Sequence, residues 1–202
     1  MRVQAIDPAH PDSSTLDTAA AILRAGGVVA FPTETFYGLG AAALNSAGVD
    51  RVFLLKGRPR SSPLLVLVDS VAMVERVAEI TDVARVLMAR HWPGALTLVL
   101  RARSAVPSAV TAGTGTVGVR LSPHPVARDL VRTLAEPITA PSANITGEPP
   151  PTRAADVVRY FGDTVDLVLD GGETPGGLAS TVLDVSVDPP RVIRAGAVHV
   201  TL

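Results

Sequence analysis

Residues 26–40 read GGVVAFPTETFYGLG, and this stretch decides the fold class. The paired glycines at its start are typical of the left-handed end of a helix, and the apolar residues 28–31 are typical of a buried strand. Pro32 ends that strand, because proline donates no hydrogen bond to a neighbouring strand. A helix that passes directly into a buried strand, followed by polar residues 33–37, indicates an α/β fold with a ligand site at the strand end.

The same patterns recur along the chain and predict a mixture of helices and strands. Apolar residues spaced three or four apart indicate helices, and short apolar runs bounded by turn-forming residues indicate strands. We expect helices from Ser13 or Ser14 to the paired glycines, over Asp50–Leu55, after Asp69, from Thr81 to Trp92, from Ser122–Pro123 to about Ala135, and after a cap at Thr152. We expect strands at residues 28–31, 64–68, 95–101, 116–121, 138–140, 166–170, 180–186 and 191–195. This order predicts a single domain over residues 1–202, of α/β class, with one twisted mixed β-sheet and flanking helices.

Composition excludes several classes of protein. The 18 basic and 19 acidic residues nearly cancel and only 3% of residues are aromatic, so neither charge nor stacking favours general nucleic-acid binding. The chain has no cysteine, which excludes disulfides and thiolate chemistry, and its four histidines lack metal-ligand spacing. No segment has the apolar length of a signal peptide or a membrane span, so we expect a cytoplasmic protein with no membrane partner.

Lys56 is the only lysine of the chain, and it begins the segment KGRPR at 56–60. Lysine presents a compact charge that bridges phosphate oxygens, whereas arginine presents a planar fork. The segment brings three cations close together, at Lys56, Arg58 and Arg60. It predicts a binding site for a polyanion, with an ordinary solvated loop as the alternative that other segments must exclude.

The sequence contains no GxxxxGK[ST] or GxSxG, and its GTGTVG at 113–118 runs into a predicted strand instead of linking a strand to a helix, so no standard nucleotide or hydrolase motif applies. Polar residues instead lie at the ends of several predicted strands, which tend to meet at one edge of an α/β sheet. Arg120 stands out, because an arginine at the end of a buried strand is costly unless it is paired with an anion. The polar segments are residues 33–40, 56–60, 116–120, 142–144 and 180–181, together with Arg194.

Seven segments, in chain order, are PTETFYGLG, KGRPRSSPL, WPGALTLVL, VGVRL, APSANITG, STVLD and RAG. In these segments the chain resembles the YrdC-like threonylcarbamoyl-AMP synthase family, in its short single-domain form, over nearly the whole length. The resemblance implies a YrdC-like fold and an enzyme, a nucleotidyltransferase that condenses L-threonine, bicarbonate and ATP to L-threonylcarbamoyladenylate and pyrophosphate. It also implies a role in the threonylcarbamoyladenosine modification of tRNA, with a separate threonylcarbamoyl transferase complex as the downstream partner.

The resemblance also implies roles for individual residues. Lys56 and Arg58 form a catalytic pair, and L-threonine is bound by Thr33, Arg120 and Ser180. ATP contacts are implied at Lys56, Arg60, Thr116, Ala140, Ser142, Asn144 and Arg194. Mg²⁺ is expected on the ATP phosphates, without metal ligands from the protein, because no dedicated cluster of carboxylates is present. Glu34 is the acidic residue closest to these motifs, and a general-base role for it is a hypothesis.

Two other functions compete with this one. A non-enzymatic module that binds double-stranded RNA or tRNA would use a concave basic surface, but the charge balance and the few aromatic residues argue against it, leaving at most a weak tRNA contact. A carbamoyl-transfer domain of the hydrogenase-maturation type has similar motifs, but lies within larger chains with zinc-finger and acylphosphatase-like parts.

Residues 171–177, GGETPGG, are a candidate lid. Ser62 stands where the family often has Asn or a longer polar residue, so no contact is assigned there.

Overall fold

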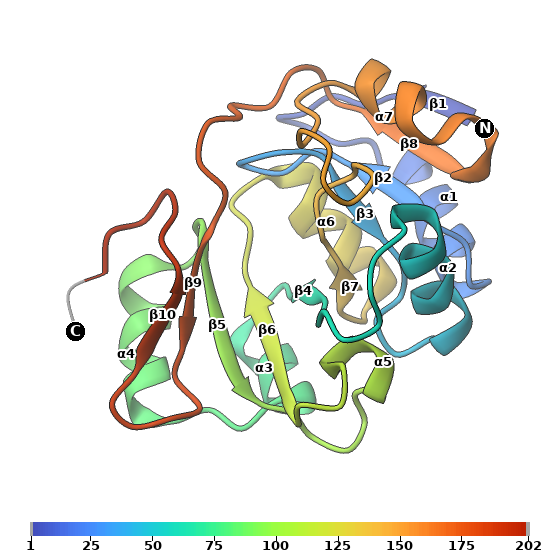
Figure 1. Ribbon diagram of the computed structural model, residues 1–202. Coiled ribbons are helices and arrows are strands. Elements are labelled where there is room, and N and C mark those ends of the chain that lie inside the picture. The colour runs from blue at the N-terminus through green and yellow to red at the C-terminus, as the bar shows by residue number, and fades with distance from the viewer. Residues whose placement is uncertain (1, 201–202) are drawn as a thin grey trace.

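The computed structural model describes residues 2–200, which form two mixed β-sheets with flanking helices (Figure 1). The four-stranded sheet has the order β1 (Arg2–Ala5), β8 (Leu167–Asp170), β2 (Val29–Phe31) and β3 (Gly38–Gly40). The six-stranded sheet has the order β10 (Arg191–Arg194), β9 (Thr181–Asp184), β5 (Leu96–Arg101), β6 (Thr116–Arg120), β4 (Leu65–Leu67) and β7 (Ile138–Thr139). The predicted mixed α/β class is confirmed, although the strands form two sheets rather than one.

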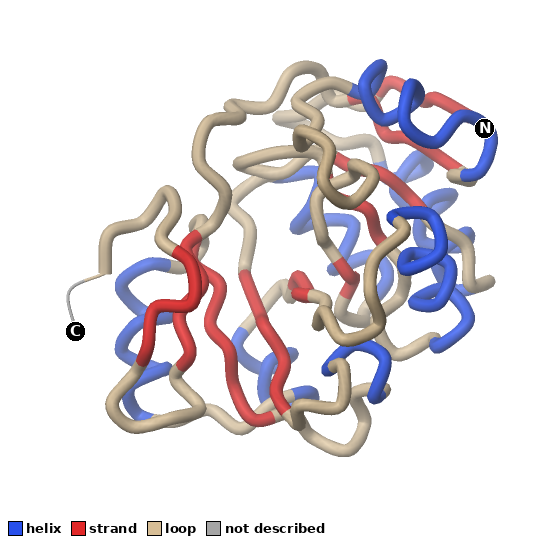
Figure 2. Tube along the Cα trace, viewed as in Figure 1, coloured by secondary structure: helices blue, strands red, loops and turns tan. Residues whose placement is uncertain are grey.

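Both sheets combine parallel and antiparallel pairs. In the first, β2 pairs with β3 antiparallel and with β8 parallel; in the second, β5 pairs with β6 antiparallel and with β9 parallel. The chain crosses between the sheets after β3, after β7 and after β8; the first two connections combine loops with a helix, and the third is a loop (Figure 2). Loops from distant parts of the sequence therefore gather where the two sheets face each other.

The helices begin and end at residues that local chemistry explains. They are α1 (Ser13–Arg24), α2 (Ser46–Lys56), α3 (Val71–Val77), α4 (Asp82–His91), α5 (Ser108–Thr111), α6 (Pro125–Leu134) and α7 (Ala154–Phe161), with a 3₁₀ turn at Gly162–Thr164. The side chain of Asn45 caps α2 by accepting from the amides of Ala47 and Gly48, and Gly57 ends it with a left-handed φ of 57°. Within residues 2–200 no helix is both long and apolar enough to cross a membrane.

Two predicted helix caps are wrong. The cap of α1 is Asp12, whose carboxylate accepts from the amide of Thr15, so Ser13 already lies inside the helix. Asp12 has the extended backbone that a cap requires, and its carboxylate satisfies an amide that the helix leaves free. The residue before α7 is Arg153 rather than Thr152, and its side chain makes no capping hydrogen bond.

Three elements were not predicted: β1, β3 and α5. β1 is mostly exposed, and α5 has only four residues, so neither carries a clear apolar pattern. β3 reads Gly-Leu-Gly, a composition that disfavours strands. Packing explains its second glycine, because a Cβ on Gly40 would lie 2.6 Å from Cε1 of Phe31 and 2.8 Å from Cγ2 of Ile138.

One hydrophobic core contacts both sheets. In β5, Leu96, Leu98 and Leu100 are fully buried on the side covered by α3 and α4 (Figure 1). Successive side chains of a strand point to opposite faces, so Thr97 and Val99 point the other way. That second face is not covered by helices and forms the functional site described next.

Candidate functional site

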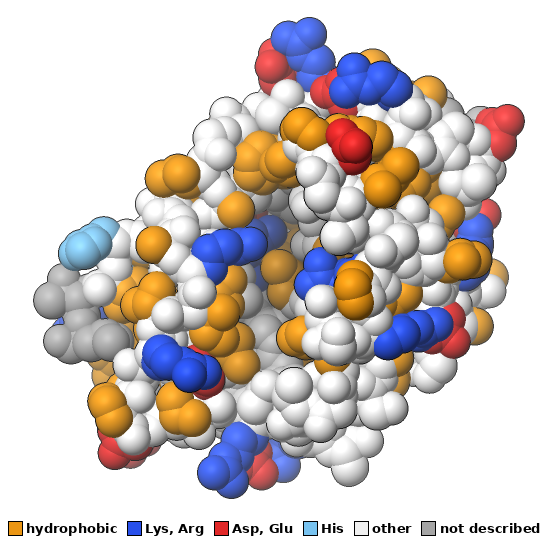
Figure 3. Space-filling model, in the orientation of Figure 1, with side chains coloured by type: hydrophobic (Ala, Val, Ile, Leu, Met, Phe, Trp, Pro, Cys, Tyr) orange, Lys and Arg blue, Asp and Glu red, His pale blue; other side chains and the backbone are white. Residues whose placement is uncertain are grey.

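A cleft of about 850 Å³ opens on this face of the six-stranded sheet. Its floor consists of alternate residues of adjacent strands, namely Thr97 and Val99 of β5, Gly118 and Arg120 of β6, and Val182 of β9. Because every second side chain of a strand points to the same face, the sequence positions of these residues place them together on the floor. Figure 3 shows the hollow, with basic side chains at its rim.

The opposite wall comes from loops that lie far apart in the sequence. Residues 33–38 follow β2, residues 61–64 follow α2, and residues 140–142 follow β7. An isolated β-bridge pairs Gly38 with Ser142, and the amide of Leu39 in β3 donates to the carbonyl of Pro141 at 2.8 Å. The segments that follow β2 and β7 are therefore connected to each other.

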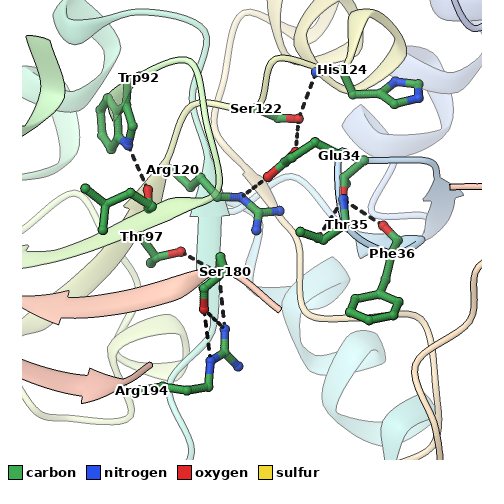
Figure 4. A network of polar contacts seen from close by, with 12 residues as sticks. Glu34, Thr35, Phe36, Trp92, Thr97, Arg120, Ser122, His124, Ser180 and Arg194 are labelled. Carbon is green, nitrogen blue, oxygen red and sulfur yellow. Dashed lines mark hydrogen bonds and ion pairs between the residues drawn. The ribbon is translucent and has the colours of Figure 1, made fainter. Parts of the chain in front are cut away.

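Arg120 is a deeply buried cation of this cleft, with 4% of its surface exposed. Its Nε lies 3.3 Å from Oε1 of Glu34, and Oε2 of Glu34 accepts a hydrogen bond from the hydroxyl of Ser122 (Figure 4). Its two Nη atoms make no hydrogen bond to any of residues 2–200. Burial lowers the pKa of Arg120, Glu34 opposes this, and Arg194 adds to it. The guanidinium therefore presents an unused fork that suits a carboxylate.

Arg194, at the end of β10, and Ser180, just before the start of β9, form a second polar pair. The pairing of β10 with β9 shifts between Val192 and Arg194, and such an irregularity re-aims the side chains that follow it. Nε and Nη2 of Arg194 donate to the carbonyl of Ser180 at 3.1 and 2.7 Å, and Nη2 also donates to its hydroxyl at 3.1 Å (Figure 4). That hydroxyl lies 3.0 Å from Oγ1 of Thr97. The hydroxyl of Ser180 is therefore held between Arg194 and Thr97.

Some arginines of the cleft are close enough for the charge of one to lower the pKa of another. Burial is the main cause that lowers the pKa of Arg58, Arg120 and Arg194, and the charge of Arg194 further lowers the pKa of the other two. Arg58 donates to the carbonyls of Ser62 and Pro63, at 3.2 and 2.9 Å, so its partners carry no charge. Like charges held together are stabilised when an anion binds among them. The cleft is therefore suited to anionic ligands.

Residues 21–196 match the model of the Sua5/YciO/YrdC family, which is described as "Telomere recombination". The chain belongs to this family. It is 46% identical over 179 residues to the threonylcarbamoyl-AMP synthase of Pyrococcus abyssi, an alignment that covers 88% of this chain and 53% of that protein. It is 41% identical over 198 residues to the threonylcarbamoyl-AMP synthase of Bacillus subtilis, covering 97% and 57% respectively. The chain thus spans a little over half the length of these two relatives.

A solved structure of the family agrees with the fold. The crystal structure of P. abyssi Sua5 complexed with L-threonine matches with a TM-score of 0.94 at 42% identity, covering 97% of this chain and 58% of that one. The family that the sequence motifs indicated is therefore confirmed, and so is the fold that it implied.

The family fold brings most of the predicted site residues to the cleft. Those that line it are Thr33, Arg58, Thr116, Arg120, Ala140, Ser142, Ser180 and Arg194. Lys56, Arg60 and Asn144 do not line it. The roles of all these residues in binding and catalysis stay predictions.

Lys56 lies at the C-terminal end of α2, as predicted, and is 2% exposed. Its Nζ donates to the carbonyls of Ser142 and Asn144 at 2.6 and 2.7 Å, and its own carbonyl accepts from the amide of Thr146 at 2.8 Å. Burial, and to a smaller extent the charge of Arg58, lowers the pKa of Lys56 to about 8. In this arrangement Lys56 fixes the loop that carries Ser142 into the cleft.

Asn144 also uses its side chain within that loop. Its Nδ2 donates to the carbonyls of Ile145 and Glu148 at 2.9 and 2.7 Å, and its Oδ1 accepts from the hydroxyl of Ser142 at 2.5 Å. The Ser-x-Asn motif therefore closes a compact turn, with Ser142 as its member in the cleft.

Arg60 lies on the outer side of the KGRPR segment. Its side chain is 58% exposed, forms an ion pair with Asp50 and lies 4.9 Å from the centroid of the Phe53 ring. A contact with ATP would require this side chain to leave both partners.

Sequence reasoning missed several residues that line the cleft or hold the residues that line it. Thr97 is buried, and the alternation in LTLVL is the signal that could have placed it opposite the core leucines. Ser122 contacts Glu34 across 88 positions, and no sequence signal pairs them. Ser62, to which no contact was assigned, lines the cleft and accepts from Arg58 through its carbonyl.

The predicted lid, residues 171–177, contacts the wall of the cleft. The carbonyl of Gly172 accepts from the hydroxyl of Tyr37 at 2.7 Å, and the amide of Gly176 donates to the carbonyl of Thr35 at 2.8 Å. The segment is thus tied to the loop that follows β2, and its opening and closing stay a prediction. Across the described part of the chain, His, Asp and Glu side chains form no group of three or more that could hold a metal ion.

Proposed function

We propose that this chain is a threonylcarbamoyl-AMP synthase. The observation that carries the proposal is the convergence of Arg58, Arg120 and Arg194 on one cleft, where Arg120 has a carboxylate partner and the other two contact only neutral groups. The reaction must hold a triphosphate and an amino-acid carboxylate next to each other. A cleft with two kinds of cationic position meets that need.

L-Threonine is assigned to Arg120, Thr33 and Ser180. The free Nη atoms of Arg120 offer a fork for the carboxylate of the substrate. The hydroxyls of Thr33 and Ser180, on residues that are each 2% exposed, can exchange hydrogen bonds with the amine or hydroxyl of the substrate. The L-threonine complex of P. abyssi Sua5, a family member of the same fold, supports this assignment.

ATP is assigned to the part of the cleft near Arg58, Arg194 and the hydroxyl of Ser142, which adjoins the L-threonine position because Arg194 donates to the hydroxyl of Ser180. Thr116 and Ala140 border this region, and Lys56, with Asn144, orders the loop that carries Ser142. Mg²⁺ enters as part of the substrate MgATP, held by phosphate oxygens and water.

In the proposed reaction, the nitrogen of L-threonine forms a bond to the carbon of bicarbonate, and water leaves to give N-carboxythreonine. An oxygen of the new carboxylate then attacks the α-phosphorus of ATP. The bond from that phosphorus to the bridging oxygen breaks, and pyrophosphate leaves with the electron pair. No side chain forms a covalent bond, so the protein contributes alignment and charge compensation.

The product would be a mixed anhydride, which is labile and must be consumed by an acyl-transfer enzyme. We propose that a separate threonylcarbamoyl transferase complex moves its acyl group to tRNA. With a net charge of -1, any direct contact of this chain with tRNA would be weak.

The test is pyrophosphate release by the purified chain with MgATP, bicarbonate and L-threonine, omitting each component in turn. We expect release that requires all of them and falls sharply in Arg194→Ala, whereas the exposed Arg132→Ala control keeps the wild-type rate. Absence of release, or release that ignores L-threonine and bicarbonate, would overturn the proposal. RNA binding that weakens steeply with added salt would then support the RNA-binding alternative.

A further inference from the structure

We propose that Glu34 is a specificity-determining residue that reserves Arg120 for a zwitterionic amino acid and keeps the triphosphate of ATP away from it, with Ser122 holding Glu34 in place. This inference rests on the proposed function and deepens it. Glu34 acts through Arg120, so it is a positioning residue rather than a catalytic one.

The arginines of the cleft differ in the charge of their partners. Arg58 donates to the carbonyls of Ser62 and Pro63, and Arg194 donates to the carbonyl and hydroxyl of Ser180. These neutral partners leave the full positive charge of both side chains for a ligand. A polyanion such as a triphosphate is attracted most strongly to such positions.

Arg120 differs from these two because it faces a carboxylate in a buried position; Arg191, the fourth arginine of the cleft lining, lies 3.7 Å from Asp184 but is 72% exposed. Glu34 lies 3.3 Å from its Nε, and the two side chains are 13% and 4% exposed, so water screens the pair little. The pair as a whole is close to neutral, yet the Nη edge of Arg120 stays open to the cleft. A carboxylate that arrives with its own ammonium group adds no net charge there, whereas a triphosphate would add several negative charges beside Glu34.

Ser122 holds Glu34 in this position, and the amide of His124, just before α6, holds Ser122. The hydroxyl of Ser122 donates to Oε2 of Glu34 and accepts from the amide of His124 at 3.2 Å. Oε1 of Glu34 is shielded from solvent and Glu34 does not line the cleft, so it has no direct path to a substrate proton. The geometry therefore favours an action on Arg120 over the general-base role considered from sequence.

The test compares wild type with Glu34→Gln, Ser122→Ala and the exposed Glu79→Gln control, using binding calorimetry and steady-state kinetics. For Glu34→Gln we expect the affinity for L-threonine to fall about tenfold, because the ion pair that positions the Arg120 guanidinium for the substrate carboxylate is lost. We also expect inorganic tripolyphosphate and excess ATP to become competitive against L-threonine, which they are not in the wild type. Ser122→Ala should shift both quantities in the same direction by a smaller factor.

A double-mutant cycle with Arg120→Lys checks that the effect passes through Arg120. In that background Glu34→Gln should change L-threonine affinity little further. A loss of turnover of about a hundredfold or more, with unchanged affinity for L-threonine, would indicate a general base and overturn the inference. Equal losses for all substrates without new competition by tripolyphosphate would indicate a merely structural role and also overturn it.

The inference and the proposed function can fail separately. A wild-type chain that releases pyrophosphate while Glu34→Gln matches it in every assay would refute only the inference. A wild-type chain that binds L-threonine but releases no pyrophosphate would refute the function, while the competition experiment would still decide the role of Glu34.

Discussion

Replacing Gly196 with alanine should disable the cleft without altering any residue that lines it. The backbone of Gly196 passes so close to β9 that a Cβ there would lie 2.2 Å from the carbonyl oxygen of Ala179 and 2.6 Å from the amide nitrogen of Thr181. Ordinary contacts of this kind are longer by about 1 Å, and the atoms met are backbone, which no rotamer change can move aside. The end of β10, with Arg194 two residues earlier, must therefore shift.

The shift has two measurable consequences. Overpacking of this kind costs about 1–3 kcal/mol of unfolding free energy, read from denaturant titration. Displacement of Arg194 from Ser180 by about 1 Å should lower kcat/KM for pyrophosphate release about a hundredfold. Ala195→Ser, at an exposed neighbouring position, should leave both quantities unchanged. A Gly196→Ala variant with normal stability and normal activity would refute the argument from close approach.

Two further predictions concern the KGRPR segment. Burial lowers the pKa of Lys56 to about 8, below the 10.5 of an unburied lysine, so between these values the unfolded chain binds more protons than the folded one. The difference in unfolding free energy between wild type and Lys56→Met should therefore rise with pH through this window, by ~3 kcal/mol at most. A difference that stays constant or falls with pH would contradict the assigned burial of Lys56. Arg58→Ala should raise the KM for ATP about tenfold, because Arg58 lines the cleft, whereas Arg60→Ala should raise it less while Arg60 stays with Asp50. A larger effect at Arg60 would mean that the side chain moves into the cleft when ATP binds.

Much of the fold follows from local sequence. The apolar run at residues 28–31, the paired glycines before it and the proline after it define β2 and the end of α1 without reference to the rest of the chain. The same holds for β5 and α4, whose patterns are strong and bounded by clear turn signals. Elements without such a pattern, namely β1, β3 and α5, form because neighbouring elements bury or pair them.

Most of the site residues that the sequence motifs indicated line the cleft, because the motifs lie next to strand ends that meet there. The motifs could not distinguish a side chain that faces the cleft from one that supports it. Lys56 and Asn144 belong to the same motifs as Arg58 and Ser142, yet their side-chain nitrogens donate to backbone carbonyls of the loop that carries Ser142. The direction of a side chain at the end of a helix or in a turn depends on what packs against it.

The sequence by itself determined the α/β class, the family and the segments that contribute to the site, because these depend on local periodicity, turn chemistry and ordered motifs. Only the tertiary structure decided that the strands divide into two sheets, and that Glu34 and Ser122 meet at Arg120 across distant parts of the chain. Such partners are fixed by burial, since a charged group removed from water must find whichever complementary group the packing brings within reach. The partner of a buried charge therefore depends on the folded arrangement of all the elements, and the local sequence around either residue does not predict it.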